Sequence, residues 1–278
     1  MSGIPADVDA DAAPPMTVPL RHFVVALAFL VAGVTVGVVE GRAGHLAQVH
    51  LLLAGWVCLT IMGALTQFVP VWCGIELHSR RLAAAQLPLA AVGFAGLAAG
   101  FLTATPALLP VAGAFALIGV WTLCYNIGRT LLAAEPDVTA IHFGWALVFF
   151  ALVTAAGIVL ALDHAAGVLP ILGIGRQGLL LAHGTLAVFG AVLTTVAGAL
   201  AQLAPMFTQA DTGKVDAAVQ RAETAVYPFG VLALAGGRLV GSPVLARFGA
   251  VLVAAGLARW RCSWHDSSSV RVSSGRRC

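Results

Sequence analysis

Two histidines, His50 and His183, open two long apolar stretches of the chain. An ionisable side chain in hydrocarbon is costly, so an intramembrane histidine suggests a function by default. Neutral imidazole binds heme iron, copper and zinc, and a heme protein needs only one or two such axial ligands. At 1.5 Å per residue, both histidines are expected roughly 6–9 Å below the start of their helices. This pattern predicts a metal or heme site between the two helices. The alternative is that each imidazole bonds a backbone carbonyl or lies in the interfacial zone.

The two stretches are copies of one pattern, from Gln48 to Trp72 and from His183 to Phe207. The matching residues lie at a constant offset of 135 residues: Gly55, Thr60, Gly63, Ala64, Leu65, Gln67 and Pro70 match Gly190, Thr195, Gly198, Ala199, Leu200, Gln202 and Pro205. In this alignment His183 matches Gln48, and His50 matches Thr185. The two histidines are therefore offset by two residues, which is about 200° around a helix.

Gly63 and Gln67 share a helix face, and so do Gly198 and Gln202 in the second copy. We expect the glycines to admit a planar macrocycle and the glutamines to hydrogen-bond a heme propionate. Close helix packing, with the following prolines as terminators, explains the same pattern equally well.

Further histidines are candidates for a second centre. His45 and His164 fall at the same end as His50 and His183, and they could hold a copper ion near the outer surface. Asp163 could also orient a ligand histidine without binding the metal itself. His142, followed by Trp145, opens a span at the opposite end. Ordinary interfacial polarity is the alternative for all of these residues.

Composition indicates the setting of these residues. Sixty per cent of residues are hydrophobic and only 10% are charged, whereas an ordinary globular domain is about 25% charged. Mean hydropathy is +0.95. Several stretches reach the roughly 20 residues needed to cross a bilayer as a helix. We therefore predict an all-α integral membrane protein in a lipid bilayer. The basic residues fall at helix ends and in the C-terminal tail, which indicates topology and excludes nucleic-acid binding.

The apolar pattern predicts seven to eight transmembrane helices, at about residues 21–39, 46–72, 82–103, 107–132, 140–162, 177–207, 223–241 and 244–259. We expect four parts: a disordered acidic tail over 1–20, a first four-helix membrane repeat over 21–132, a second repeat of three to four helices over 133–258, and a basic tail over 259–278 that is native or a frameshifted end. An even number of spans per half predicts parallel repeats.

The distribution of basic residues predicts a cytoplasmic N-terminus in the cell membrane. Six basic residues fall at the N-terminal side and at most four at the opposite side. The first group is Arg21, Arg80, Arg81, Arg129, Lys214 and Arg221, and the second is Arg42, Arg176, Arg238 and Arg247.

The stretch from His50 to Pro70, followed by Val71-Trp72-Cys73-Gly74, resembles the signature helix of NnrS-type membrane proteins. It is also similar to the histidine-bearing helices of heme-copper oxidase subunit I, and Ala182-His183 through Pro205-Met206 looks like a second such helix. The resemblance covers most of residues 21–250. It implies a membrane protein that binds heme of unspecified type, with copper as a further cofactor, linked to respiration or nitric oxide metabolism.

The chain departs from the oxidase pattern. It has no adjacent pair of histidines for a copper centre, and its tyrosines, Tyr125 and Tyr227, match no oxidase motif. Because the full ligand set is not found, we expect electron transfer, sensing or an accessory role beside respiratory-chain subunits or small electron carriers, and enzyme activity is left open. Two other hypotheses remain: a small-solute transporter without heme, and a structural partner subunit.

Overall fold

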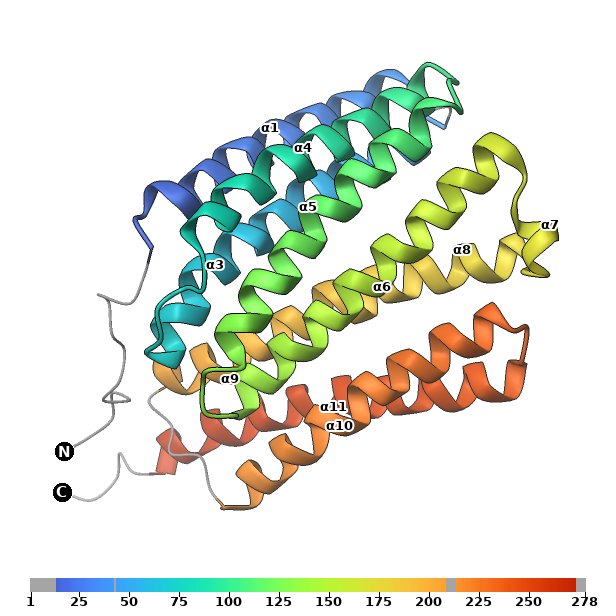
Figure 1. The fold of residues 1–278 in the computed structure, drawn as a ribbon. Coiled ribbons are helices and arrows are strands. Elements are labelled where there is room, and N and C mark those ends of the chain that lie inside the picture. The colour runs from blue at the N-terminus through green and yellow to red at the C-terminus, as the bar shows by residue number, and fades with distance from the viewer. Residues whose placement is uncertain (1–13, 43, 209–213, 274–278) are drawn as a thin grey trace.

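The computed structural model describes residues 14–42, 44–208 and 214–273, and the secondary structure within these ranges is helical without strands. The all-α prediction is therefore confirmed. The helices are α1 (Thr17–Val39), α2 (His45–Val49), η2 (His50–Cys58), α3 (Leu59–Cys73), α4 (Arg80–Leu102), α5 (Leu108–Leu131), α6 (Val138–Ala166), α7 (Leu169–Leu172), α8 (Arg176–Thr185), η3 (Leu186–Val192), α9 (Leu193–Thr208), α10 (Lys214–Leu239) and α11 (Pro243–Ser273). The segments α2, η2 and α3 form one continuous rod, as do α8, η3 and α9 (Figure 1).

Six of the described helices are long and apolar enough to cross a membrane: Thr17–Val39, His45–Cys73, Arg80–Leu102, Leu108–Leu131, Val138–Ala166 and Arg176–Ala204. This is the organisation of a multi-pass membrane protein. The predicted seventh and eighth spans correspond to α10 and α11. Charged residues occupy the first turns of α10, and the apolar part of α11 covers only Pro243–Ala258.

Local chemistry sets several helix boundaries. The side chain of Ser79 accepts a hydrogen bond from Leu82 N at the start of α4, and Asp137 does the same for Ala140 N at the start of α6. Such N-caps satisfy backbone donors that the first turn leaves unpaired. Gly74 and Gly167 end α3 and α6 in the left-handed conformation, with φ of 62° and 63°. These stops place the charged connections at the ends of the bundle.

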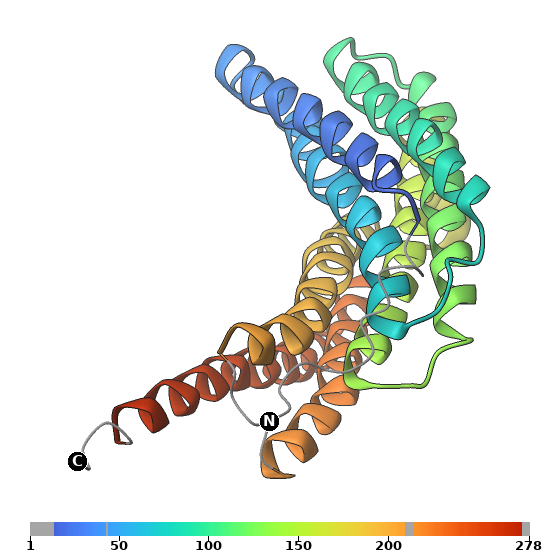
Figure 2. The ribbon, with the colours of Figure 1, turned by 90° about the vertical axis from the view of Figure 1, so that its left-hand side faces the viewer.

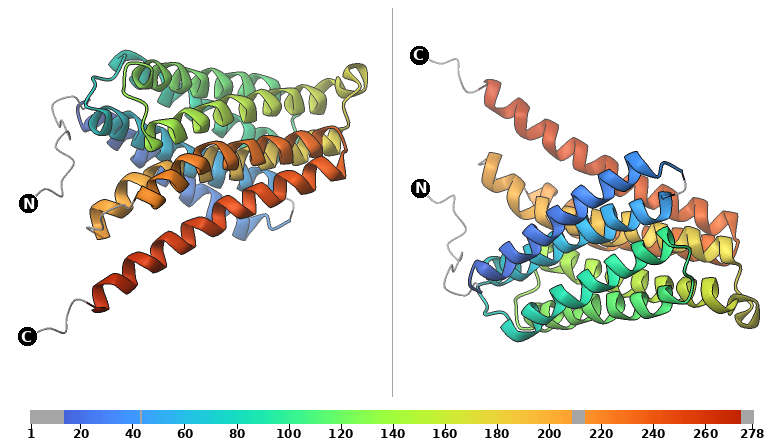
Figure 3. Two further views of the ribbon diagram at one scale, coloured as in Figure 1. Left: turned by 90° about the horizontal axis from the view of Figure 1, so that it is seen from below. Right: turned by 90° about the horizontal axis from the view of Figure 1, so that it is seen from above.

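The long helices lie roughly along one axis (Figure 3). α4 packs along α5, α10 along α11, and α5 along α6, while α1 packs on the η2–α3 rod. Seen from the side, the helices follow an open arc, with α1 and the α4–α5 pair diverging at one end (Figure 2). The α5–α6 contact joins the first four long helices to the last four.

The same helix contacts occur in both halves. A Cβ at Gly55 would collide with Phe29 of α1, and a Cβ at Gly190 would collide with Phe149 of α6. In the pair α4 and α5, Gly119 abuts Ala90. In the pair α10 and α11, Gly256 abuts Tyr227, and both of these residues lie 137 positions after their counterparts. Recurring contacts at fixed offsets support the interpretation of two parallel four-helix units.

The predicted tails correspond only in part to described residues. The acidic tail over 1–20 lies outside them up to residue 13, and α1 already begins at Thr17. At the other end α11 continues through the predicted basic tail as far as Ser273, and residues 274–278 lie outside the described part.

Candidate heme site between the two halves

His50 is the first residue of η2, and its own helix fixes its orientation. Nδ1–H of His50 donates to the carbonyl of Leu46, one turn earlier, at 2.7 Å. The ring packs against Phe101 of α4, with ring centroids 5.0 Å apart. The imidazole is half-buried where α4 covers the beginning of the rod.

His183 lies near the end of α8, and a neighbouring helix fixes its orientation. Nδ1–H of His183 donates across the helix interface to the carbonyl of Val153 in α6, at 3.0 Å. Gly157 leaves room for the ring, because a Cβ there would lie 3.2 Å from Cε1 of His183. The imidazole is half-buried like that of His50.

The surroundings of His50 and His183 meet at α6: Phe101, against which the His50 ring packs, also contacts the ring of His164 in α6, and α6 provides the carbonyl that accepts from His183. In both rings the Nδ1–H bond to a carbonyl leaves the lone pair on Nε2. Metal-binding histidines use this arrangement, since a hydrogen bond from the non-ligating nitrogen fixes the tautomer and the ring orientation. Two such imidazoles, one from each half, match the donor set of a bis-histidine heme. The alternative that each imidazole bonds a backbone carbonyl therefore holds for Nδ1 of both rings. Such a bond does not occupy Nε2, which keeps its lone pair for a ligand.

Both rods contain a π-helical segment at the level of these histidines. The segment η2 covers His50–Cys58, and η3 covers Leu186–Val192, which begins three residues after His183. π-Helical turns are rare and frequently occur at functional sites. Tyr227 of α10 donates from its hydroxyl to the carbonyl of Phe189 in η3 at 2.7 Å. The backbone irregularity thus recurs in the two copies and is tied to a neighbouring helix in the second.

The glycines proposed to admit a macrocycle instead face helices. A Cβ at Gly63 would lie 2.7 Å from Cβ of His22, and a Cβ at Gly198 would lie 2.9 Å from Cβ of His142. The space beside each glycine is therefore filled by α1 or α6, which favours the close-packing interpretation. Of the glutamines, Gln67 is half-buried with its Oε1 unpartnered, and Gln202 is half-buried.

The secondary candidates do not gather into a metal centre. His45 is exposed at the start of α2. His164 is also exposed, and its Nδ1 faces the guanidinium of Arg176 at 3.2 Å, while Arg176 also pairs with Asp163. Among the described residues no three histidine, cysteine, aspartate or glutamate side chains come together to hold a metal ion. A copper site built from His45 and His164 therefore lacks a third ligand of these types in the described part of the chain.

The histidines that occupy equivalent positions in the two halves are His22 and His142, 120 residues apart. Nδ1–H of His22 donates to Val18 O at 2.9 Å, and Nδ1–H of His142 donates to Val138 O at 2.8 Å. Both are almost fully buried. The motif His-Phe followed six residues later by Phe occurs at both places and could have revealed the pair. The pair was missed because the two copies were aligned at an offset of 135 residues, whereas His22 and His142 are 120 residues apart.

The repeat positions of the site residues differ between the halves. In the first half, Phe101 contacts His50. The corresponding residues of the second half are Arg238 and Thr185, and there Arg238 donates a hydrogen bond to Thr185. Gln48 abuts Gly37 of α1 in the first half where His183 abuts Gly157 in the second. The candidate site therefore consists of residues that differ between corresponding positions of the two halves.

Comparison with protein-family models, with curated proteins and with solved structures finds no match for this chain.

Proposed function

We propose that this chain is a polytopic heme-binding membrane protein with His50 and His183 as axial ligands. The observation that carries the proposal is the pair of imidazoles, one from each half, whose Nδ1–H groups are both held by backbone carbonyls so that Nε2 carries the lone pair in each ring. Bound heme would supply one-electron redox chemistry or a gas-binding iron. The chain's own contribution is to orient two Nε2 atoms within apolar helices.

The role that fits this ligand set is electron transfer, sensing or service as an accessory subunit beside respiratory-chain subunits or small electron carriers. Heme alone satisfies the proposal, because the described residues offer no three-ligand copper site. We place the protein in the cell membrane with a cytoplasmic N-terminus, on the asymmetry of basic residues.

The test is a reduced-minus-oxidised spectrum and a pyridine hemochrome assay on detergent-purified protein expressed with heme supplied, with copper quantified in the same sample. We expect about one heme per chain, as a single bis-histidine iron requires. His50→Ala and His183→Ala should each change the heme content or the spectrum. His45→Ala, at an exposed histidine outside the proposed ligand pair, is the matched control.

Unchanged heme in both His50→Ala and His183→Ala would refute the ligand assignment. Protein that binds no heme at all would refute the proposed function, and uptake of a small solute by such protein in liposomes would support the transporter hypothesis.

A further inference from the structure

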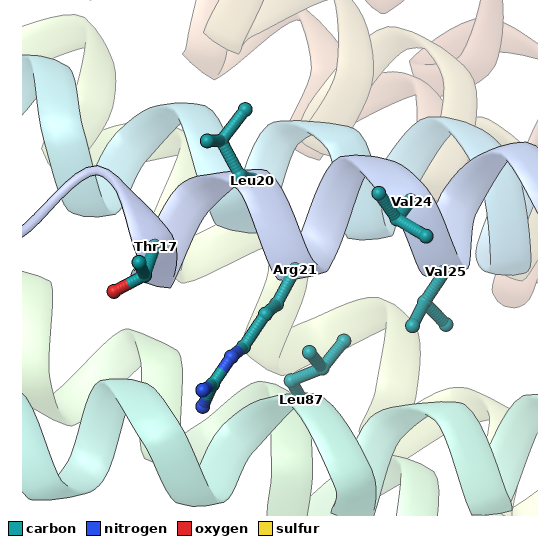
Figure 4. Close-up of a pocket in the computed structure, with 6 residues that line it drawn as sticks. All are labelled: Thr17, Leu20, Arg21, Val24, Val25 and Leu87. Carbon is teal, nitrogen blue, oxygen red and sulfur yellow. The ribbon is translucent and has the colours of Figure 1, made fainter.

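A groove opens between α1 and α4 at the end of the bundle where both helices begin. Its volume is about 440 Å³, and it is lined by Thr17, Leu20, Arg21, Val24, Val25 and Leu87. In Figure 4 Arg21 extends from α1 across the groove toward α4, and Leu87 rises from α4 on the opposite wall. The walls are thus aliphatic, with one cation near one end.

A buried polar contact joins the two helices beside this groove. Nε2 of Gln86 in α4 donates to Nε2 of His22 in α1 at 3.2 Å, and both side chains are almost fully buried. These residues are direct neighbours of the lining residues Leu87 and Arg21. The contact holds α1 and α4 together locally, while the rest of the two helices have few contacts with each other.

The second half carries a larger side chain at the position that corresponds to the groove residue Val25. The counterpart of Val25 is Trp145 of α6, and its ring meets Phe229 of α10 with centroids 5.6 Å apart. Phe229 is itself the counterpart of Val92, an exposed residue of α4. Two aromatic side chains therefore meet between α6 and α10, whereas the residues at the corresponding positions of α1 and α4 are valines.

The two halves also differ in the charge at this position. The counterpart of Arg21 is Ile141. Arg21 is exposed, it forms no salt bridge within the described part of the chain, and no acidic residue lines the groove. Arg80 and Arg129 lie at the same end of the bundle, where α4 begins and α5 ends. A guanidinium presents a fork of donors that matches phosphate oxygens.

We propose that this groove binds an anionic phospholipid, with the phosphate at Arg21 and Thr17 and one acyl chain along Val24, Val25 and Leu87. Cation-bearing pockets between transmembrane helices recognise anionic headgroups in this way. The acyl chain would lie beside Val25, where the second half has the larger Trp145. The inference stands apart from heme binding, since it uses none of the proposed heme ligands.

The test is native mass spectrometry of the full-length protein titrated with phosphatidylglycerol or with phosphatidylcholine of identical acyl chains. We expect the wild type to prefer phosphatidylglycerol by about five- to tenfold, because its headgroup has a net negative charge, whereas the choline cation neutralises the phosphate of phosphatidylcholine; this is the order expected for one arginine beside an anionic headgroup. Arg21→Gln should abolish this preference. Arg129→Gln, at an exposed arginine of the same end outside the groove, should preserve it.

A second variant tests the acyl-chain part independently. Val25→Trp installs the side chain that the second half uses, and it should reduce binding of both lipids at this site while heme content stays as in the wild type. An unchanged preference in Arg21→Gln, equal binding of the two lipids by the wild type, or undiminished binding in Val25→Trp would each overturn the proposal.

Discussion

Gly157 offers a way to move the His183 imidazole without removing it. A Cβ at Gly157 would lie 3.2 Å from Cε1 and 3.6 Å from Nδ1 of His183, so a small side chain already crowds the ring. The branched side chain in Gly157→Val reaches further into this space and pushes the ring away from Val153. The hydrogen bond from Nδ1 to Val153 O, now 3.0 Å, should then be lost.

The expected loss of heme affinity follows from the hydrogen bond between His183 and Val153 O. A typical intramolecular hydrogen bond contributes about 0.5–1.5 kcal/mol, which corresponds to about two- to tenfold in an equilibrium constant. We therefore expect heme affinity to fall by about two- to tenfold in Gly157→Val, with the stoichiometry at saturating heme unchanged. The assay is a spectrophotometric titration of heme into protein prepared without it.

Gly144→Val is the matched control, because Gly144 lies on the same helix, α6, and a Cβ there meets nothing within 4 Å. It makes the same change in helix propensity without touching His183. Equal heme affinity in the two valine variants would refute the role assigned to the Val153 bond, and so would a loss confined to Gly144→Val.

Three further predictions concern stability and are measured by thermal unfolding in detergent. Gly93→Ala should be less stable than Gly236→Ala by about 1–3 kcal/mol, because a Cβ at Gly93 collides with the backbone of Ala116 while one at Gly236 meets nothing within 4 Å; equal stability would contradict the packing argument. Tyr227→Phe should destabilise by about 1 kcal/mol through loss of the bond to Phe189 O, and a wild-type melting temperature would argue against that bond. Asn126→Ala should cost about 1–3 kcal/mol, because the buried Asn126 accepts from Ser79 N and donates to Ser79 O, and its loss leaves the Ser79 N–H without this acceptor; the matched Thr122→Ala, at an exposed hydroxyl of α5, should stay close to the wild type.

The sequence was sufficient to predict where the membrane-length helices lie, because apolar runs and charged breaks mark them, but α10 begins nine residues before the predicted span at 223 and α11 continues past 259 to Ser273. The span expected at 82–103 is Arg80–Leu102, and the one expected at 107–132 is Leu108–Leu131. The π-helical segments could not be predicted, since their residues have the same apolar composition as the α-helical residues around them.

The sequence showed only part of the repeat, because helices and connections of different length change the offset between the two copies. The link from α6 to α8, which contains α7, is longer than the link from α1 to α2, and the second half also has a longer first helix and an earlier start of its rod. The offset therefore rises from 120 at His22 and His142 to 135 at Gly63 and Gly198. The hydrogen bond from His183 to Val153 O could not be predicted from the sequence either, since it depends on how α6 and α8 are rotated relative to each other.

The different anchors of the two candidate ligands have a consequence for biosynthesis. His50 bonds a carbonyl of its own rod, so its ring is oriented as soon as that rod forms. His183 bonds a carbonyl of α6, so its orientation must wait until α6 and α8 have emerged from the ribosome and docked. A nascent chain halted after α5 would thus display one oriented imidazole without its partner. Cofactor insertion at a two-ligand centre would then be a late event in assembly, after the second half has entered the membrane.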